Sequence, residues 1–137
     1  MKRLLAIDYG ERHIGIALSD PAQLIAFPYL TIDTKKTPLF FSKIAEIVNK
    51  QDIEKVILGI PLNTENVETK KSIQIRNFAK ELKQYIDLPI IFSDESCTTQ
   101  EAIKVLHLKK KSLKKNKFRL DMIAASLILK DYLANRK

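Results

Sequence analysis

The stretch LLAIDYGERHIGIALS, residues 4–19, decides the fold class of this chain. Two apolar runs, Leu4–Tyr9 and Ile14–Ser19, flank the turn-prone segment Gly10-Glu11-Arg12, which predicts an antiparallel hairpin. A third strand is expected at Phe27–Ile32, where Pro28 requires a ladder position that needs no N–H donor. The chain should therefore begin with a three-stranded antiparallel meander.

Helical spacing replaces this pattern after residue 37. The apolar residues between Phe40 and Val48 predict a helix, with Thr37 as its cap and Pro38 at its first position. The wholly apolar run Val56–Ile60, halted by Pro61, is typical of a strand buried on both faces, as in a parallel sheet. The remaining expected elements are a helix over Glu68–Tyr85, a strand over Ile90–Phe92, and helices over Thr99–Leu108 and Leu120–Leu133.

This order of elements predicts a single α/β domain over residues 1–137. Its sheet should be mixed and five-stranded, with the antiparallel meander joined to two parallel strands and helices on both faces. A chain of 137 residues is long enough for one substantial core.

The charge balance indicates the kind of partner. The chain has 24 Lys and Arg against 16 Asp and Glu, a net charge of +8. This excess favours nucleic acid or an anionic surface, although solubility alone is an alternative. No apolar run approaches the roughly 20 residues that span a bilayer, and the N-terminus does not resemble a signal peptide, so we expect no membrane partner and a cytoplasmic location. Cys97, the only cysteine, excludes an intramolecular disulfide.

Acidic residues stand at the ends of several apolar elements. Asp8 ends the first strand, the pair Asp94-Glu95 ends the run Leu88–Phe92, and Asp121 opens the apolar pattern of the last helix. Each has a structural alternative, as a turn residue or as an acid at a helix N-terminus. Ionised carboxylates beside apolar elements are costly unless a cation meets them, and Mg²⁺ binds oxygen ligands. Together they predict a metal site suited to phosphodiester chemistry.

The helical spacing of Asp121 supports an inward orientation. Asp121, Ala124, Ala125 and Ile128 share one face, and the small alanines allow that face to approach the sheet closely. The histidines His13 and His107 and the single Cys97 are expected to have ordinary surface or core roles.

A lysine-rich run, KKKSLKKNK at residues 109–117, precedes the last helix. Such a run is typical of a solvated, mobile loop. Close to a metal site, it could also hold a phosphate backbone without reading bases.

Four collinear stretches give the chain a specific resemblance: AIDYGERHIGIALSD at residues 6–20, LGIPLN at 58–63, DESCTT at 94–99 and DMIAA at 121–125. In these the chain resembles the bacterial YqgF-type family, described as candidate Holliday junction resolvases and pre-16S rRNA nucleases. The resemblance implies a ribonuclease H-like fold. It also implies a catalytic, metal-binding site of Asp8, Glu95 and Asp121, with Asp94 as an accessory metal ligand.

The chain departs from the family where an Arg usually follows the Asp-Glu pair, since it has Ser96. It also reads Thr64-Glu65-Asn66-Val67 where relatives tend to a glycine-containing loop. Other cations would then have to contact the phosphate backbone, and the expected nucleic-acid-binding residues are Arg12, Lys109, Lys110, Lys111, Lys114, Lys115 and Lys117.

The resulting hypothesis is a nuclease that uses one or two Mg²⁺ or Mn²⁺ ions, as a monomer or a homodimer. Structured RNA, in particular the 5′ end of pre-16S ribosomal RNA, is the first expected substrate, and a branched DNA such as a Holliday junction is the second. Two other classes stay open: a non-catalytic RNA-binding ribosome-assembly factor, and a nucleotide-binding ATPase of the sugar kinase and actin type, which would need a second domain.

Overall fold

The computed structural model of the protein describes residues 2–61, 69–94 and 117–136. The elements within these ranges are β1 (Arg3–Tyr9), β2 (His13–Ser19), β3 (Ala26–Asp33), α1 (Phe40–Lys50), β4 (Ile53–Ile60), α2 (Lys70–Leu82), β5 (Ile90–Asp94) and α4 (Lys117–Asn135). The expected helix over Thr99–Leu108 lies outside the described residues.

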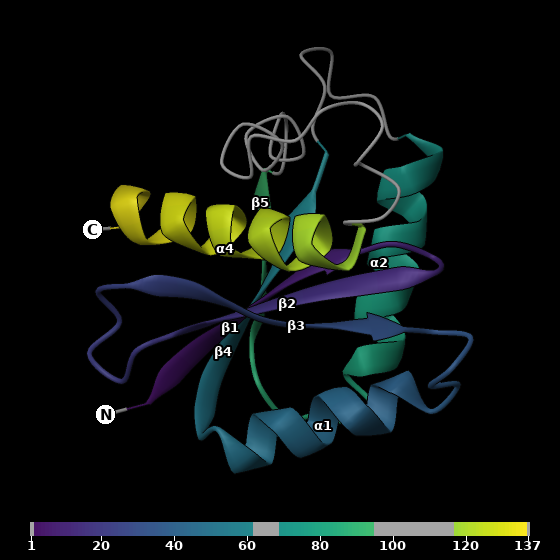
Figure 1. The fold of residues 1–137 in the computed structure, drawn as a ribbon, viewed down its shortest axis with the longest axis horizontal. Coiled ribbons are helices and arrows are strands. Elements are labelled where there is room, and N and C mark those ends of the chain that lie inside the picture. The colour runs from purple at the N-terminus through teal and green to yellow at the C-terminus, as the bar shows by residue number, and fades with distance from the viewer. Residues whose placement is uncertain (1, 62–68, 95–116, 137) are drawn as a thin grey trace.

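The strands form one mixed sheet in the order β3-β2-β1-β4-β5 (Figure 1). The first three strands pair antiparallel, whereas β4 pairs parallel to both β1 and β5. The predicted fold class is therefore confirmed. Because β1, β4 and β5 run in the same direction, their carboxyl ends meet at one edge of the sheet.

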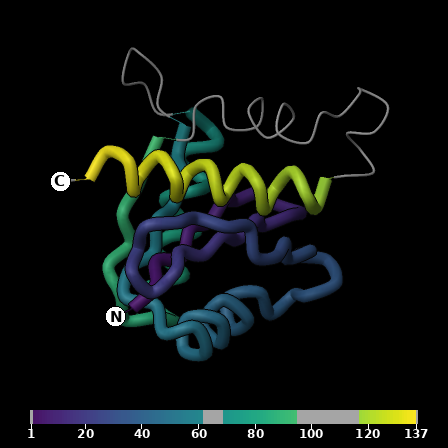
Figure 2. Tube along the Cα trace, turned by 60° about the vertical axis from the view of Figure 1, so that its left-hand side comes forward, coloured from purple at the N-terminus to yellow at the C-terminus, as the bar shows by residue number. Residues whose placement is uncertain are grey.

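Helices cover both faces of the sheet, with α4 on one side and α1 on the other (Figure 2). Alternation along β1 explains this, because Leu4 and Ala6 point to one face and Leu5 and Ile7 to the other. Leu4 and Ala6 belong to the apolar cluster that packs against α4. Leu5 and Ile7 belong to the larger cluster, which includes buried residues of α1 and α2.

The start of α1 differs from the prediction. Its N-cap is Leu39, so neither Thr37 as the cap nor Pro38 as the first helical residue is correct. The backbone N–H of Thr37 instead donates to the Asp33 carbonyl at 2.8 Å. The Asp33 side chain also accepts from the backbone N–H of Lys35, so the turn after β3 engages the residues that would have opened the helix.

Two other helices also differ in their bounds. Helix α2 begins at Lys70 because Thr69 and Ser72 form a capping box, and it ends at Leu82, before the expected Tyr85. Helix α4 already includes Lys117, so Asp121 is not in its first turn as the sequence suggested. No helix in the described part of the chain is both long and apolar enough to cross a membrane.

Candidate active site at the carboxyl edge of the sheet

Asp8 lies near the carboxyl end of β1, on the face covered by α4. It follows Leu4 and Ala6 at the spacing of alternate strand residues, and both of these pack in the α4 cluster. In the antiparallel ladder Asp8 pairs with Gly15 of β2. Directly opposed residues share a face, so Gly15 also faces α4.

At Gly15 the backbone of β2 lies very close to the backbone of α4. A Cβ atom there would lie 2.0 Å from the carbonyl oxygen of Asp121 and 2.9 Å from the backbone nitrogen of Met122. Cβ atoms of opposed strand residues are about 4.5–5.5 Å apart. Asp8 and the backbone of Asp121 therefore both lie next to Gly15, on the same face and at the same edge of the sheet.

The Asp121 carboxylate is buried, with 6% of the residue exposed. Burial raises its pKa, and the hydrogen bond and charge of Lys117, followed by the electrostatic effects of His13 and Lys71, partly oppose this shift. Lys117 Nζ lies 2.8 Å from Oδ1. Oδ2 has no hydrogen-bond partner among the residues that the structure describes, and His13 Nδ1, at 3.9 Å, is beyond hydrogen-bond distance. Within the described part of the chain, one carboxylate oxygen is thus buried without a hydrogen-bond partner, which is costly.

Lys71 supplies a second cation on the α2 side of the edge. Its Nζ donates to the Tyr9 carbonyl at 2.7 Å and lies 5.5 Å from the centroid of the Tyr9 ring. The Tyr9 ring packs in turn on Phe78 of α2 at 4.5 Å. Lys71 therefore fixes the backbone directly after Asp8 while adding positive charge beside the carboxylates.

The structure does not bring Asp94 to this group. Asp94 ends β5 opposite Ile60 of β4, two strands away from β1, which is about 10 Å at the usual strand spacing. Ile91 packs in the α4 cluster, so Asp94, three positions later, points to the other face. Glu95 lies outside the described residues. Within the ranges described, no three His, Cys, Asp or Glu side chains form a group that could hold a metal.

Arg12, an expected nucleic-acid ligand, is held by another residue. Its guanidinium donates to Asp33 from Nε at 2.9 Å and from Nη2 at 3.3 Å. Chiefly through this hydrogen bond, the pKa of the Asp33 carboxyl falls to about 2. The pair joins the β1–β2 turn to the end of β3, so the structure gives Arg12 a structural contact. The lysines between 109 and 115 lie outside the described residues, whereas Lys117 lies in α4 beside Asp121.

Sequence reasoning missed His13 and Lys71. The alternation of β2 was a usable signal for His13, because His13 and Gly15 are two positions apart in the strand and therefore share a face. The His13 ring also meets Phe118 edge-on, with centroids 4.7 Å apart. For Lys71 the signal was the pair Lys70-Lys71 at the start of α2, where positive charge opposes the helix dipole.

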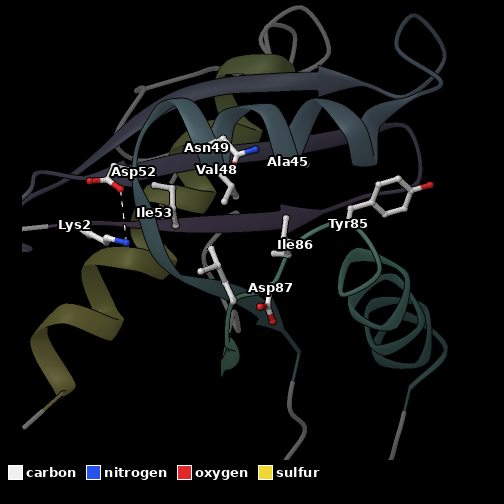
Figure 3. A pocket seen from close by; sticks show the side chains of 10 residues that line it. Lys2, Ala45, Val48, Asn49, Asp52, Ile53, Tyr85, Ile86 and Asp87 are labelled. Carbon is white, nitrogen blue, oxygen red and sulfur yellow. Dashed lines mark ion pairs between the residues drawn. The ribbon is translucent and has the colours of Figure 1, made fainter.

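A separate cavity, of about 290 Å³, lies at the opposite end of the parallel strands (Figure 3). Lys2 before β1, Ile53 at the start of β4 and Leu88 before β5 contribute to its lining, and Lys2 Nζ lies 3.8 Å from Asp52. Asp8, Asp94 and Asp121 do not line it, so it is not part of the candidate active site.

Solved structures with this fold include two resolvases. A fowlpox virus resolvase, solved with Holliday junction DNA, matches with a TM-score of 0.58 and 18% identity over 96% of this chain and 97% of that chain. RuvC of T. thermophilus, also solved with a Holliday junction substrate, matches with a TM-score of 0.57 and 10% identity over 97% and 94%. At these identities the matches concern the fold, and they confirm the ribonuclease H-like prediction.

Sequence relatives are considerably more similar. A protein of Maridesulfovibrio salexigens, named as a candidate pre-16S rRNA nuclease, is 36% identical over 135 residues, which cover 96% of this chain and 98% of the relative. The sequence model of the family described as RuvX, Holliday junction resolvase, matches residues 2–135. The chain therefore belongs to the RuvX family, as its resemblance to the YqgF-type proteins predicted.

Proposed function

We propose that this protein is a divalent-metal-dependent nuclease whose site is built on Asp8 and Asp121. One observation carries the proposal: the chain buries an ionisable carboxylate on the same face and edge as Asp8, and one oxygen of this carboxylate has no hydrogen-bond partner among the residues described. A structural role for Asp121 would be served better by a neutral side chain, since burial already disfavours its ionised form.

The chemistry of the donor set fits a hard cation. Carboxylate oxygens are the ligands that Mg²⁺ and Mn²⁺ prefer, and the buried Oδ2 of Asp121 lacks a partner within the described ranges. When bound, one or two such cations would supply Lewis-acid chemistry, which activates water and neutralises the charge on a phosphate undergoing in-line displacement.

We assign the third carboxylate to Glu95. Asp94, the last residue of β5, lies on the other face of the sheet from Asp8. The resemblance to the YqgF-type family implies Glu95 as a ligand, and Glu95 lies outside the described residues. The accessory role expected for Asp94 is accordingly not part of the proposed site.

Lys71 and Lys117 are the proposed cations for the substrate backbone at this edge. Arg12 is engaged by Asp33, and Ser96 cannot supply the charge of the usual Arg. Lys71 would also position Asp8, since its contact with the Tyr9 carbonyl fixes the following peptide. Ammonium groups recognise phosphate as point charges and need no base contacts.

The favoured substrate is structured RNA at the 5′ end of pre-16S ribosomal RNA. The names of the most similar relatives support this choice. Branched DNA is the second candidate, supported by the description of the family. Backbone cleavage uses chemical features common to both, so a direct comparison of substrates is required.

The test is cleavage of labelled precursor RNA and of a labelled four-way DNA junction, each with Mg²⁺ and with a chelator. We expect Mg²⁺-dependent turnover of the RNA in preference to the junction. Asp8→Asn should abolish cleavage and leave RNA binding near normal, because it removes a ligand charge and little volume. Asp131→Asn, which removes an exposed charge from α4, is the matched control and should retain activity.

The outcomes separate the alternatives. Preferential cleavage of the junction would favour the resolvase function. RNA binding without turnover at any Mg²⁺ or Mn²⁺ concentration would favour a non-catalytic assembly factor. Equal loss of binding and cleavage in Asp8→Asn would show that Asp8 is structural.

A further inference from the structure

The Asp121 carboxylate is met by a cation from its own helix. Lys117, one turn before Asp121, places Nζ 2.8 Å from Oδ1. The two side chains differ in their surroundings, because Lys117 is 51% exposed and Asp121 only 8%. The ammonium therefore reaches the buried carboxylate from the solvent side, by which a dissolved cation would also arrive.

This pair is poorly suited to stabilising the helix. A basic residue four positions before an acidic one is the less favourable order for a helical ion pair. Lys117 also lies near the N-terminal end of α4, where positive charge opposes the helix dipole. The contact is better explained by the need of the buried Asp121 for a counter-ion.

A metal ion and the ammonium would compete for the same carboxylate. A divalent cation binds through oxygen lone pairs, and the hydrogen-bond contact with Lys117 engages Oδ1. Lysine can leave without a change in the helix, since its charge is carried on a flexible four-carbon stem. Lys71 differs from Lys117, because it influences Asp121 by electrostatic attraction while its ammonium is hydrogen-bonded to the Tyr9 carbonyl.

We propose that Lys117 is an exchangeable counter-ion for Asp121, which it holds in place in the absence of metal and releases when a divalent cation binds. The inference rests on the proposed metal site and assigns Lys117 a positioning role. It predicts that metal binding is weakened by the lysine and that removal of the lysine alone tightens it.

The experiment is calorimetric titration of the full chain with Mn²⁺, without nucleic acid. Lys117→Met keeps the length and helix propensity of the side chain and removes the charge. We expect it to bind Mn²⁺ about two- to fivefold more tightly than the native protein, the upper part of the range for an exposed ion pair. Lys117→Arg keeps the charge and should bind no more tightly than the native protein.

Two controls separate contact from general electrostatics. Lys70→Met removes an exposed charge at the start of α2, and Lys130→Met removes an exposed charge elsewhere on α4. Both should change the affinity less than twofold. Equal tightening in all three methionine variants would overturn the proposal, because the effect would then be that of net charge.

An unchanged affinity in Lys117→Met would also overturn it, while the proposed nuclease site would stand. Absence of Mn²⁺ binding by the native protein and every variant would overturn both.

Discussion

Gly15→Ala should destabilise the protein by about 3 kcal/mol, the upper part of the range for adding a methyl group to a packed interior. The new Cβ would lie 2.0 Å from the Asp121 carbonyl oxygen, whereas ordinary contacts begin near 3.4 Å. The clashing atoms belong to backbone, so no side-chain rotation relieves the contact. Helix α4 would have to retreat by more than an ångström.

That retreat has two consequences. A radial gap of about 1 Å forfeits up to half of the dispersion attraction across an interface, here between α4 and the cluster around Ala125 and Ile128. It also moves Asp121 away from Asp8, so Mn²⁺ affinity should fall together with stability.

Urea denaturation followed by circular dichroism measures the free energy of unfolding, and amide hydrogen exchange reports on α4 separately. Gly10→Ala is the comparison, because its Cβ would meet the His13 carbonyl at 2.7 Å within the hairpin and not α4. We expect reduced protection in α4 for Gly15→Ala alone. A Gly15→Ala protein within about 0.5 kcal/mol of the native stability, the usual effect of a surface substitution, would refute the reasoning.

Three further predictions concern charge. Asp121→Asn should stabilise the metal-free protein at neutral pH, since burial raises the pKa of this carboxyl. The gain in the free energy of unfolding should shrink as the pH falls through that raised pKa. A variant that is less stable than the native protein at pH 7 would contradict the prediction. Asp33→Asn should destabilise the protein at neutral pH, because a carboxyl whose pKa is lowered from 3.8 to about 2 stabilises the fold when it is ionised. The difference in denaturation midpoint from the native protein should disappear as the pH falls to about 2. The last prediction concerns five lysines replaced together with Ser: Lys109, Lys110, Lys111, Lys114 and Lys115. The slope of log K against log salt for nucleic-acid binding should fall in magnitude by roughly 0.7–0.9 for each phosphate that these lysines neutralise, and the free energy of unfolding should change little. An unchanged slope would mean that the nucleic acid binds elsewhere on the protein.

The sheet could be predicted from the sequence because strand signals are local and consistent. The apolar runs Leu4–Tyr9 and Ile14–Ser19 on either side of a turn-prone segment indicate a hairpin, and the uninterrupted apolar run before Pro61 indicates a buried parallel strand. The position of Pro28 agreed with an edge strand, and β3 is one. The order of strands and helices along the chain then indicated a mixed sheet with helices on its faces.

Helix ends were less predictable, because side chains from other elements compete for the capping positions. At α1, Asp33 engages the following turn, and a helix signal at Thr37 and Pro38 could not reveal that competitor. At α4, Lys117 was assigned to a solvated run on composition, although lysine is a good helix former.

Sequence reasoning selected Asp8 and Asp121 for the candidate site and overlooked two basic residues beside them. Asp8 and Asp121 stand out because carboxylates at apolar elements conflict with the local pattern, which is expected where function outweighs stability. Lysines are common in this basic chain, so composition alone did not single out Lys71, and strand spacing alone did not reveal what His13 contacts. Their tertiary contacts, with the Tyr9 carbonyl and near the Asp121 carboxylate, identify them.

The close approach at Gly15 links the fold to the proposed chemistry. A side chain at this position would separate α4 from β2, so the absence of a Cβ allows the helix to carry Asp121 to the edge where Asp8 lies. The same closeness removes water from the Asp121 carboxylate and raises its pKa. Burial thus creates the need for a cation, and Lys117 meets part of that need from the solvent side. A buried acid whose counter-ion can leave is stable enough to fold without metal and still able to bind one, which is the property that a metal-dependent nuclease requires of its ligand.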